Sequence, residues 1–333
     1  MSIIAIIGAR GIPKDFPGTS GIEAYIEEQL SDISRKSQVT CYIRSWVLAD
    51  KTISRFNGAT IIPIHSINTT HLDTVSYSFL ATIIASFSKS DIIWYHGVGP
   101  AFFSFIPLLF KKKIYITIHA LDWERKKWGR VAKLFLMLSE QIALRCANKI
   151  FTVSKELEQR YKTMGYDNVA LSVYSIKRRQ AMPLKIISDK YGLKKYQYIL
   201  FIGRFVPEKR IEWLIRAADY IPMPIVLAGG SSHTDTYSQM IHGMAHSKKV
   251  IFTGYVFGRE KEELLSNCRL FVLPSNVEGY PISVAEALSY NKICLVGDFL
   301  RNEYKKNRNV LYFRTHQFNN FLLTLQEIIK KTS

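Results

Sequence analysis

Two glutamates, Glu278 and Glu286, are separated by seven residues around the run Gly279-Tyr280-Pro281. The sequence predicts a strand that ends at Pro274, a loop that carries Glu278, and a helix in which proline at 281 occupies the first position. N–H groups at the start of such a helix attract an anion, and a carboxylate accepts hydrogen bonds from sugar hydroxyls. Capping is the plainer role for these acids, but the full string is more specific than capping requires.

A second loop combines two cations. In the run 203–210, Arg204 and Lys209 lie five residues apart after another predicted strand. Arginine can bind two phosphate oxygens at once and lysine supplies a point charge, so the pair can stabilise the charge that develops on a departing diphosphate. The alternative is ordinary surface charge. A lysine near a helix N-terminus is unfavourable by itself, which favours a bound anion.

The first predicted strand is followed by a glycine-rich loop. It reads Gly8-Ala9-Arg10-Gly11-Ile12-Pro13 and continues to Gly18 and Gly21, where a helix is predicted to begin. Glycines allow backbone N–H groups to approach a diphosphate. The spacing differs from GxGxxG, and no acidic residue ends the second strand, so a nicotinamide cofactor is not indicated.

These loops belong to a regular alternation of short β-branched runs and amphipathic segments, which is typical of parallel βα units. The basic stretch 171–195 interrupts the alternation, so we expect two doubly wound α/β domains, at residues 1–175 and 190–333, with a cleft between them. Strands are predicted near 2–8, 39–44, 60–64, 91–96, 113–119, 149–153, 198–203, 224–228, 250–253, 270–274, 293–296 and 310–313. Helices are predicted near 21–36, 74–88, 129–147, 155–164, 208–218, 260–267, 281–289 and 317–331.

Composition limits the class of protein. The 333 residues are 47% hydrophobic and 22% charged, as in globular proteins. The four cysteines show no CxxC spacing, so neither a zinc site nor a disulfide framework is indicated. The longest apolar stretches, near 79–87 and 101–110, have about half of the roughly 20 residues needed to span a bilayer. No signal peptide is recognised before the first strand. We therefore expect a soluble or peripheral protein.

The net charge of +18 favours an anionic partner such as nucleic acid, acidic lipid or a phosphorylated substrate. Eight basic residues fall within 111–133, directly after the apolar run 101–110. Apolar and basic residues side by side are what an anionic membrane surface binds. A buried helix followed by a solvated lysine turn is the alternative. No nucleic-acid recognition motif is present, so nucleic acid is not the expected partner.

Taken together, these motifs resemble the retaining glycosyltransferases of family 4, which have the GT-B fold with two Rossmann-like domains. The resemblance rests on Glu278 and Glu286 with the run between them, and on the loop from Gly203 to Lys209. The loop from Gly8 to Pro13 and the segment 117–129 resemble the rhamnosyltransferase-like branch, which has a DUF1972-type first domain. The match covers nearly the whole chain. Two departures are Ala120, where glycine is usual, and the absence of Pro-Asn-Gly in 171–177.

The resemblance implies a role for each matching residue. Residues implied in the chemistry are His119, Arg204, Lys209 and Glu278. Residues implied in donor binding are Gly18, Gly21, Gly203, Gly279, Tyr280, Pro281, Ile282 and Glu286. Residues implied in acceptor or sugar contacts are Arg10, His96, Asp122 and Arg125, although a purely structural role for His96 stays open.

Within these sets the implied contacts differ. His119 would contact the transferred sugar, and Arg204 with Lys209 would hold the diphosphate. Glu278 would bind sugar hydroxyls, while Glu286 would bind the ribose. No metal or other cofactor is implied, and the sequence contains no Asp-x-Asp pair of the kind that metal-dependent glycosyltransferases use.

The implied reaction moves a sugar, with L-rhamnose from dTDP-rhamnose as the first choice, to a lipid-linked or growing cell-surface glycan. UDP- or GDP-sugars of GlcNAc, galactose, glucose or mannose are alternatives. A GT-B isomerase or a non-catalytic paralogue that serves as a partner subunit would be a different class. The expected location is the cytoplasm, at the inner face of the membrane.

Overall fold

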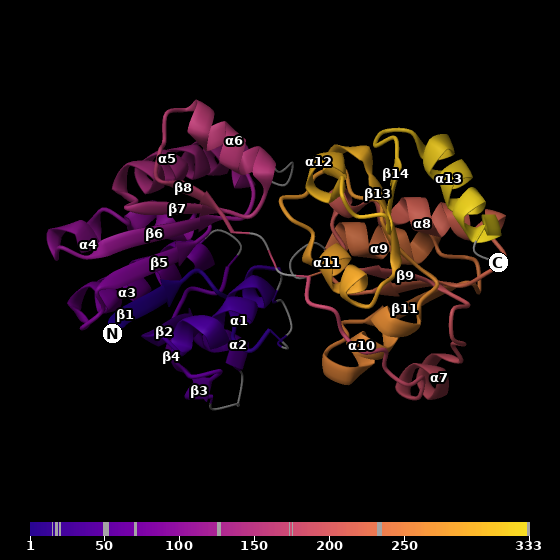
Figure 1. Ribbon diagram of the computed structural model, residues 1–333, viewed down its shortest axis with the longest axis horizontal. Coiled ribbons are helices and arrows are strands. Elements are labelled where there is room, and N and C mark those ends of the chain that lie inside the picture. The colour runs from indigo at the N-terminus through magenta and orange to yellow at the C-terminus, as the bar shows by residue number, and fades with distance from the viewer. Residues whose placement is uncertain are drawn as a thin grey trace. The chain divides into compact units, whose positions relative to one another are not determined.

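The computed structural model describes residues 1–14, 16, 19, 21–48, 53–69, 72–124, 128–172, 174, 176–231 and 235–331. The chain divides into two compact units, Met1–Tyr174 and Ser175–Ser333 (Figure 1). Each unit contains one sheet of mainly parallel strands with helices packed against it. This arrangement confirms the predicted α/β class with two doubly wound domains.

The sheet of the first unit has the strand order β3-β4-β2-β1-β5-β6-β7-β8, in which only the β3–β4 pair is antiparallel. Its strands are β1 (Ser2–Ile7), β2 (Ser37–Arg44), β3 (Arg55–Phe56), β4 (Ala59–Ile64), β5 (Ile92–His96), β6 (Lys113–Ile118), β7 (Lys149–Thr152) and β8 (Val169–Leu171). Its helices are α1 (Gly21–Ser34), α2 (Ser45–Leu48), α3 (Asp73–Phe87), α4 (Ile106–Leu109), α5 (Arg130–Cys146) and α6 (Lys155–Thr163).

The sheet of the second unit is fully parallel in the order β11-β10-β9-β12-β13-β14. Its strands are β9 (Ile199–Ile202), β10 (Ile225–Ala228), β11 (Val250–Gly254), β12 (Leu270–Leu273), β13 (Ile293–Gly297) and β14 (Val310–Phe313). Its helices are α7 (Ile186–Tyr191), α8 (Ile211–Ala217), α9 (Asp235–Met244), α10 (Gly258–Asn267), α11 (Ile282–Ser289), α12 (Arg301–Tyr304) and α13 (Phe318–Lys331).

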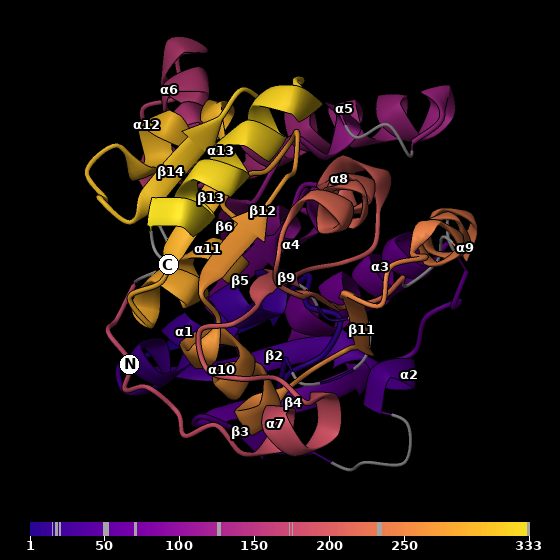
Figure 2. The same ribbon diagram turned by 90° about the vertical axis from the view of Figure 1, so that its right-hand side faces the viewer.

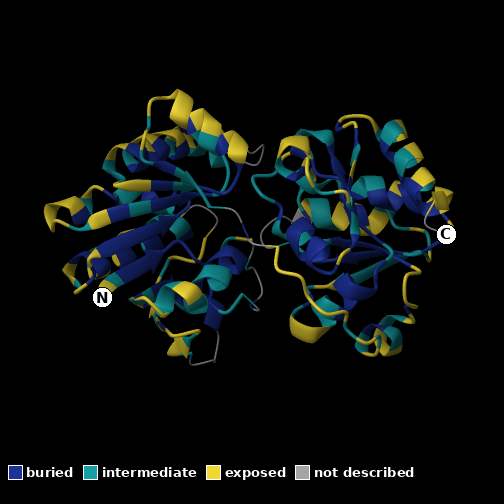
Figure 3. Ribbon diagram, in the orientation of Figure 1, coloured by how far each residue is buried: buried dark blue, intermediate teal, exposed yellow. Residues whose placement is uncertain are grey.

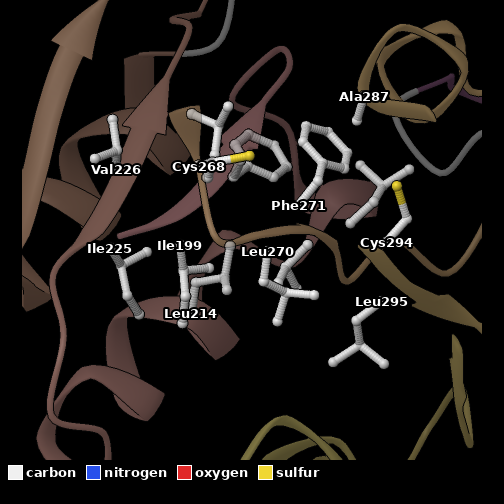
Figure 4. Close-up of a cluster of buried hydrophobic side chains, with 14 of the residues drawn as sticks. Ile199, Leu214, Ile225, Val226, Cys268, Leu270, Phe271, Ala287, Cys294 and Leu295 are labelled. Carbon is white, nitrogen blue, oxygen red and sulfur yellow. The ribbon is translucent and has the colours of Figure 1, made fainter. Parts of the chain in front are cut away.

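The cores lie on the sheets. Central strands are buried along their whole length because helices cover them, which is why their sequences are continuous apolar runs (Figure 3). In the second unit Ile199, Ile225 and Leu270 come from three neighbouring strands and are all buried, with Leu214 of α8 among them (Figure 4).

Strand order fixes where loops meet. In the first sheet β1 lies between β2 and β5, and in the second β9 lies between β10 and β12. Chain connections leave in opposite directions at such a point, so the loops at the carboxyl ends of the two central strands separate and leave room for a ligand. The glycine-rich loop follows β1 and the loop with Lys209 follows β9, and both loops are therefore at these positions.

The structure also contains elements that the sequence analysis did not predict. Strands β3 and β8 and helices α2, α4, α7, α9 and α12 are all new. One predicted detail is wrong: Pro281 is the N-cap of α11, with an extended ψ of 96°, and the first helical residue is Ile282. The proline ring fixes φ near a value that suits both the first turn of a helix and an extended residue before it. Residue type alone therefore did not separate these two positions.

Gly229, which follows β10, provides a test of this packing. It has a φ of +142°, and a Cβ added there would lie 1.8 Å from the carbonyl oxygen of Gly203. We expect Gly229→Ala to lower the free energy of unfolding by at least about 2 kcal/mol, since strain and overlap add. The measurement is thermal and urea unfolding. Gly243→Ala, in α9 with nothing near the added carbon, is the matched control and should be neutral or stabilising. Equal stability of the two variants would contradict this packing.

Candidate active site

The candidate site of the second unit is built around an ion pair between Lys209 and Glu278. Lys209 ends the short 3-10 helix Pro207–Lys209 after β9, and Glu278 lies in the loop after the neighbouring β12. Their side chains are only 17% and 12% exposed. The backbone N–H of Asn276 donates to the carbonyl of Glu208 at 3.0 Å and ties the two loops together.

This pair brings together the chemistry that the two motifs predicted separately. An ammonium has three donors and Glu278 accepts one of them, so a phosphate can take others. The partly buried position excludes much of the water and strengthens each charge interaction. Arg204, also half-buried, lies five residues before Lys209 on the same loop. The site can therefore bind an anionic group beside a carboxylate that accepts hydrogen bonds.

Glu286 has a different environment. It lies in the middle of α11, is 4% exposed, and its Oε1 accepts a hydrogen bond from Nζ of Lys261 at 2.7 Å. The lysine comes from α10 and was not among the predicted residues. No sequence signal identifies it, because 25 residues separate the partners. Four further predicted donor residues lie at the start of α11: Gly279 and Tyr280 are half-buried, Pro281 is buried and Ile282 is half-buried. Gly203, half-buried, directly follows β9.

In the first unit two histidines meet at the carboxyl ends of adjacent strands. His96 ends β5 and His119 follows β6, and Nδ1 of His96 lies 3.2 Å from Nε2 of His119. The Tyr25 ring of α1 stands edge-on to His119, with ring centroids 5.0 Å apart. Its hydroxyl donates to the Ser172 hydroxyl at 2.7 Å. Tyr25 was not predicted as a site residue.

Hydrogen bonding indicates which nitrogen of His96 carries the proton. Its side chain is buried, and Nε2 has no hydrogen-bond partner among the described residues. A buried N–H without an acceptor is costly, so the neutral ring is favoured with its proton on Nδ1, directed at His119. Burial lowers the pKa of His96 well below its usual value of 6.5, and the neighbouring His119 lowers it further. His96 can therefore orient His119 through this hydrogen bond.

The loop after β1 is held by buried acids. The backbone N–H of Arg10 donates to Glu23 of α1 at 2.8 Å. Arg44 of β2 forms a buried ion pair with Asp73 at 2.6 Å and donates to the carbonyl of Ala9 at 3.2 Å. The hydrogen bonds to Ala9 and from Arg10 fix the start of the glycine-rich loop. Gly21 is the exposed first residue of α1.

The segment after β6 carries Asp122, which is half-buried at the start of the 3-10 helix Asp122–Glu124. The indole of Trp123 donates to the buried Glu140 of α5 at 2.5 Å, and Tyr161 donates to the other oxygen at 2.6 Å. These bonds anchor the segment. Two predicted residues, Gly18 and Arg125, lie outside the described residues. Within the described part of the chain, no cluster of three metal-binding side chains occurs, and no helix has the length and hydropathy to span a membrane.

Protonation of His96 gives a pH test. Because its pKa is lowered in the folded state, the unfolded chain binds the proton more readily below about pH 6.5. The associated stability is therefore complete above that pH and is lost as the pH falls. We expect His96→Gln, which cannot titrate, to reduce the decrease in melting temperature between neutral and mildly acidic pH. His246→Gln, at an exposed position, should keep the wild-type slope. A wild-type slope in both variants would contradict the assignment.

Comparison with known proteins finds one family match in each unit. Residues 1–176 match the family described as "Domain of unknown function (DUF1972)", and residues 185–303 match "Glycosyl transferases group 1". The chain is 30% identical over 128 residues to O-antigen chain mannosyltransferase B of Escherichia coli, covering 36% of this chain and 33% of the relative. It is 25% identical over 228 residues to the Escherichia coli UDP-Gal:alpha-D-GlcNAc-diphosphoundecaprenol alpha-1,3-galactosyltransferase, covering 64% and 56%. The matches thus span between a third and somewhat over half of these relatives.

Solved structures show the same fold over the whole chain. Anabaena HepE in complex with UDP and glucose has a TM-score of 0.79 at 13% identity, covering 100% of this chain and 91% of that chain. Sucrose-phosphate synthase from Thermosynechococcus elongatus also has a TM-score of 0.79, at 16% identity, covering 100% and 90%. The chain therefore belongs to the DUF1972 family, matches the glycosyl transferases group 1 family in its second half, and has the GT-B fold.

Proposed function

We propose that this protein transfers a sugar from a nucleoside diphosphate to a hydroxyl of a lipid-linked glycan, with retention at the anomeric carbon. The observation that carries the proposal is the Lys209–Glu278 pair at the carboxyl ends of β9 and β12. It sets a cation for the diphosphate next to a carboxylate for the sugar hydroxyls. The names of the relatives support both substrates, since one is a galactosyltransferase that uses UDP-Gal and acts on a diphosphoundecaprenol-linked sugar.

In the proposed reaction the chain acts by charge stabilisation and positioning. Lys209 and Arg204 stabilise the negative charge that builds on the leaving diphosphate. Glu278 orients the sugar through its hydroxyls, and Glu286 binds the ribose. His119, oriented by His96, contacts the transferred sugar. A phosphate oxygen of the leaving group takes the proton of the acceptor hydroxyl, so that the new bond forms on the face that the diphosphate leaves.

Two lines of support point to different donor sugars. The glycine-rich loop and the 117–129 segment resemble the rhamnosyltransferase-like branch, which makes dTDP-L-rhamnose the first candidate. UDP- and GDP-sugars form the second candidate, because the relatives are named for galactose and mannose and HepE is described in complex with UDP and glucose. The site chemistry that handles the diphosphate is common to both.

A screen of nucleotide sugars distinguishes these donors. We expect one of dTDP-rhamnose, UDP-galactose, UDP-GlcNAc, UDP-glucose and GDP-mannose to raise the melting temperature most. The same donor should release its nucleoside diphosphate when a polyprenyl-diphosphate saccharide is present. Transfer is expected to persist in EDTA, because the proposed charge stabilisation comes from Lys209 and Arg204. A donor that binds without any transfer would instead identify a non-catalytic partner subunit.

The ion pair itself can be tested with a double-mutant cycle. Lys209→Met should destabilise the protein by about 3 kcal/mol, because the partly buried Glu278 loses its counter-charge. Lys209→Met combined with Glu278→Gln should recover most of that stability, because neither partner remains charged. Sugar transfer should fall about 10²- to 10³-fold in Lys209→Met and in Glu278→Gln, each made alone, and should stay low in the double variant.

The matched control is Lys190→Met, which breaks the exposed ion pair with Glu260. Exposed pairs contribute little, so we expect near wild-type stability and turnover. If the double variant regained transfer together with stability, the pair would be structural and the proposed site would be wrong.

A further inference from the structure

One side of the first unit exposes apolar side chains to an unusual extent. Of the 23 large hydrophobic residues that are exposed in the described part of the chain, twelve lie between Phe79 and Leu138. They belong to α3, to α4 with its flanking residues, and to α5. We refer to the exposed apolar side chains of these three segments as the apolar face. Patches of this extent on a protein surface mark interaction sites.

Each segment contributes a continuous stripe. On α3 the exposed residues Phe79, Leu80, Ile84 and Phe87 follow helical spacing, and Phe87 is 73% exposed. The opposite side of α3, with Ser78, Ala81 and Ala85, is buried against the sheet. An exposed apolar stripe on a helix that is already packed on its other side has no role in the core of this unit.

The second stripe is the short helix α4 and its ends. Phe105, Leu108, Leu109 and Phe110 are all exposed, and Leu109 reaches 80%. The third stripe is the first half of α5, where Val131, Leu134, Met137 and Leu138 face outward and Val131 reaches 84%. Over these turns α5 presents apolar residues to the solvent and also packs inward through Phe135.

Aromatic contacts join the stripes into one surface. The Phe87 and Phe110 rings are 4.7 Å apart and link α3 to α4. The ring of Phe79 contacts that of Phe103, which ends the 3-10 helix Pro100–Phe103, with ring centroids 5.3 Å apart. The neighbouring Phe102 contacts Phe135 of α5 at 4.7 Å. The labels α5, α4 and α3 follow one another down one side of the first unit in Figure 1.

Basic residues accompany the apolar face. Lys111 and Lys113 are exposed directly after α4, Lys89 is exposed after α3, and Arg130 is exposed at the start of α5. Between residues 74 and 121 the only acidic residue is Asp91, and its carboxylate accepts a hydrogen bond from the backbone of Ile3. The surroundings of the apolar face are therefore strongly positive.

We propose that the apolar face docks on the surface of an anionic lipid bilayer, with Leu109 and Leu134 entering the boundary between headgroups and acyl chains. Such a surface matches both properties, since acyl chains cover the apolar side chains and anionic headgroups pair with the lysines. If a second copy of the chain covered the apolar face, the basic residues around the two faces would lie close together and repel each other. The inference goes beyond the proposed function, because it holds for any donor sugar.

Co-flotation with vesicles tests the docking without donor or acceptor, so its outcome is independent of sugar transfer. We expect the protein to bind vesicles of equal parts phosphatidylglycerol and phosphatidylcholine and not vesicles of phosphatidylcholine alone. Leu109→Ser combined with Leu134→Ser should reduce binding at least about tenfold, because two exposed leucines no longer enter the apolar layer. Lys111→Gln combined with Lys113→Gln should also reduce it about tenfold, and added salt should weaken wild-type binding.

The control is Leu323→Ser, which removes an exposed leucine of α13 in the second unit and should leave binding unchanged. All substituted side chains are exposed, and melting temperatures verify that each variant is folded. Wild-type binding by the Leu109→Ser and Leu134→Ser double variant would overturn the proposal. A second outcome would also overturn it: analytical ultracentrifugation without lipid shows a wild-type dimer, and the same double variant is a monomer. The apolar face would then be an interface between copies.

Discussion

The reversal of strand order, at β1 in one unit and at β9 in the other, is the constraint on which the candidate site residues of each unit depend. Parallel strands all end at the same edge of a sheet, so the loops after β1, β5 and β6 gather at one edge and those after β9 and β12 gather at another. The described site residues of these loops are brought close by that edge alone. Helices that cover both faces of each sheet leave the carboxyl edge as the place where polar groups can face a ligand.

Buried ion pairs and hydrogen bonds then fix the loops at those edges. Arg44 with Asp73 supports the loop after β1, Lys209 with Glu278 joins the loops after β9 and β12, and Lys261 supports Glu286. Removing charges from water offsets much of what each pair gains, so the pairs contribute direction more than stability. His96 likewise contributes direction: burial keeps its ring neutral, and its Nδ1–H points at His119.

The first unit therefore has two specialised regions that use different physics. Its carboxyl edge carries directional hydrogen bonds around His119. Its apolar face carries a non-directional surface of helix side chains with lysines nearby. A ligand with a polar reacting end and an apolar anchor would require both kinds of region on one protein.

The sequence by itself determined most of the elements and the motif positions, because apolar periodicity and turn chemistry act over a few residues. It predicted twelve of the strands and most of the longer helices, the two mainly parallel sheets and the loops that carry Arg204, Lys209 and Glu278. The hairpin β3–β4 was also within its reach, since Asn57-Gly58 is a common hairpin turn and both residues have positive φ.

Tertiary structure alone decided the partners. Lys261 and Glu286 are 25 residues apart, His96 and His119 are 23 apart, and Tyr25 reaches Ser172 across 147 residues. Such contacts depend on strand order and helix docking, which many sequences of the same local pattern share. Likewise, local periodicity shows that a helix has an apolar side, but only packing decides whether that side is buried. The outward apolar residues of α3 and α5 are exposed because other residues of the same helices already cover the sheet.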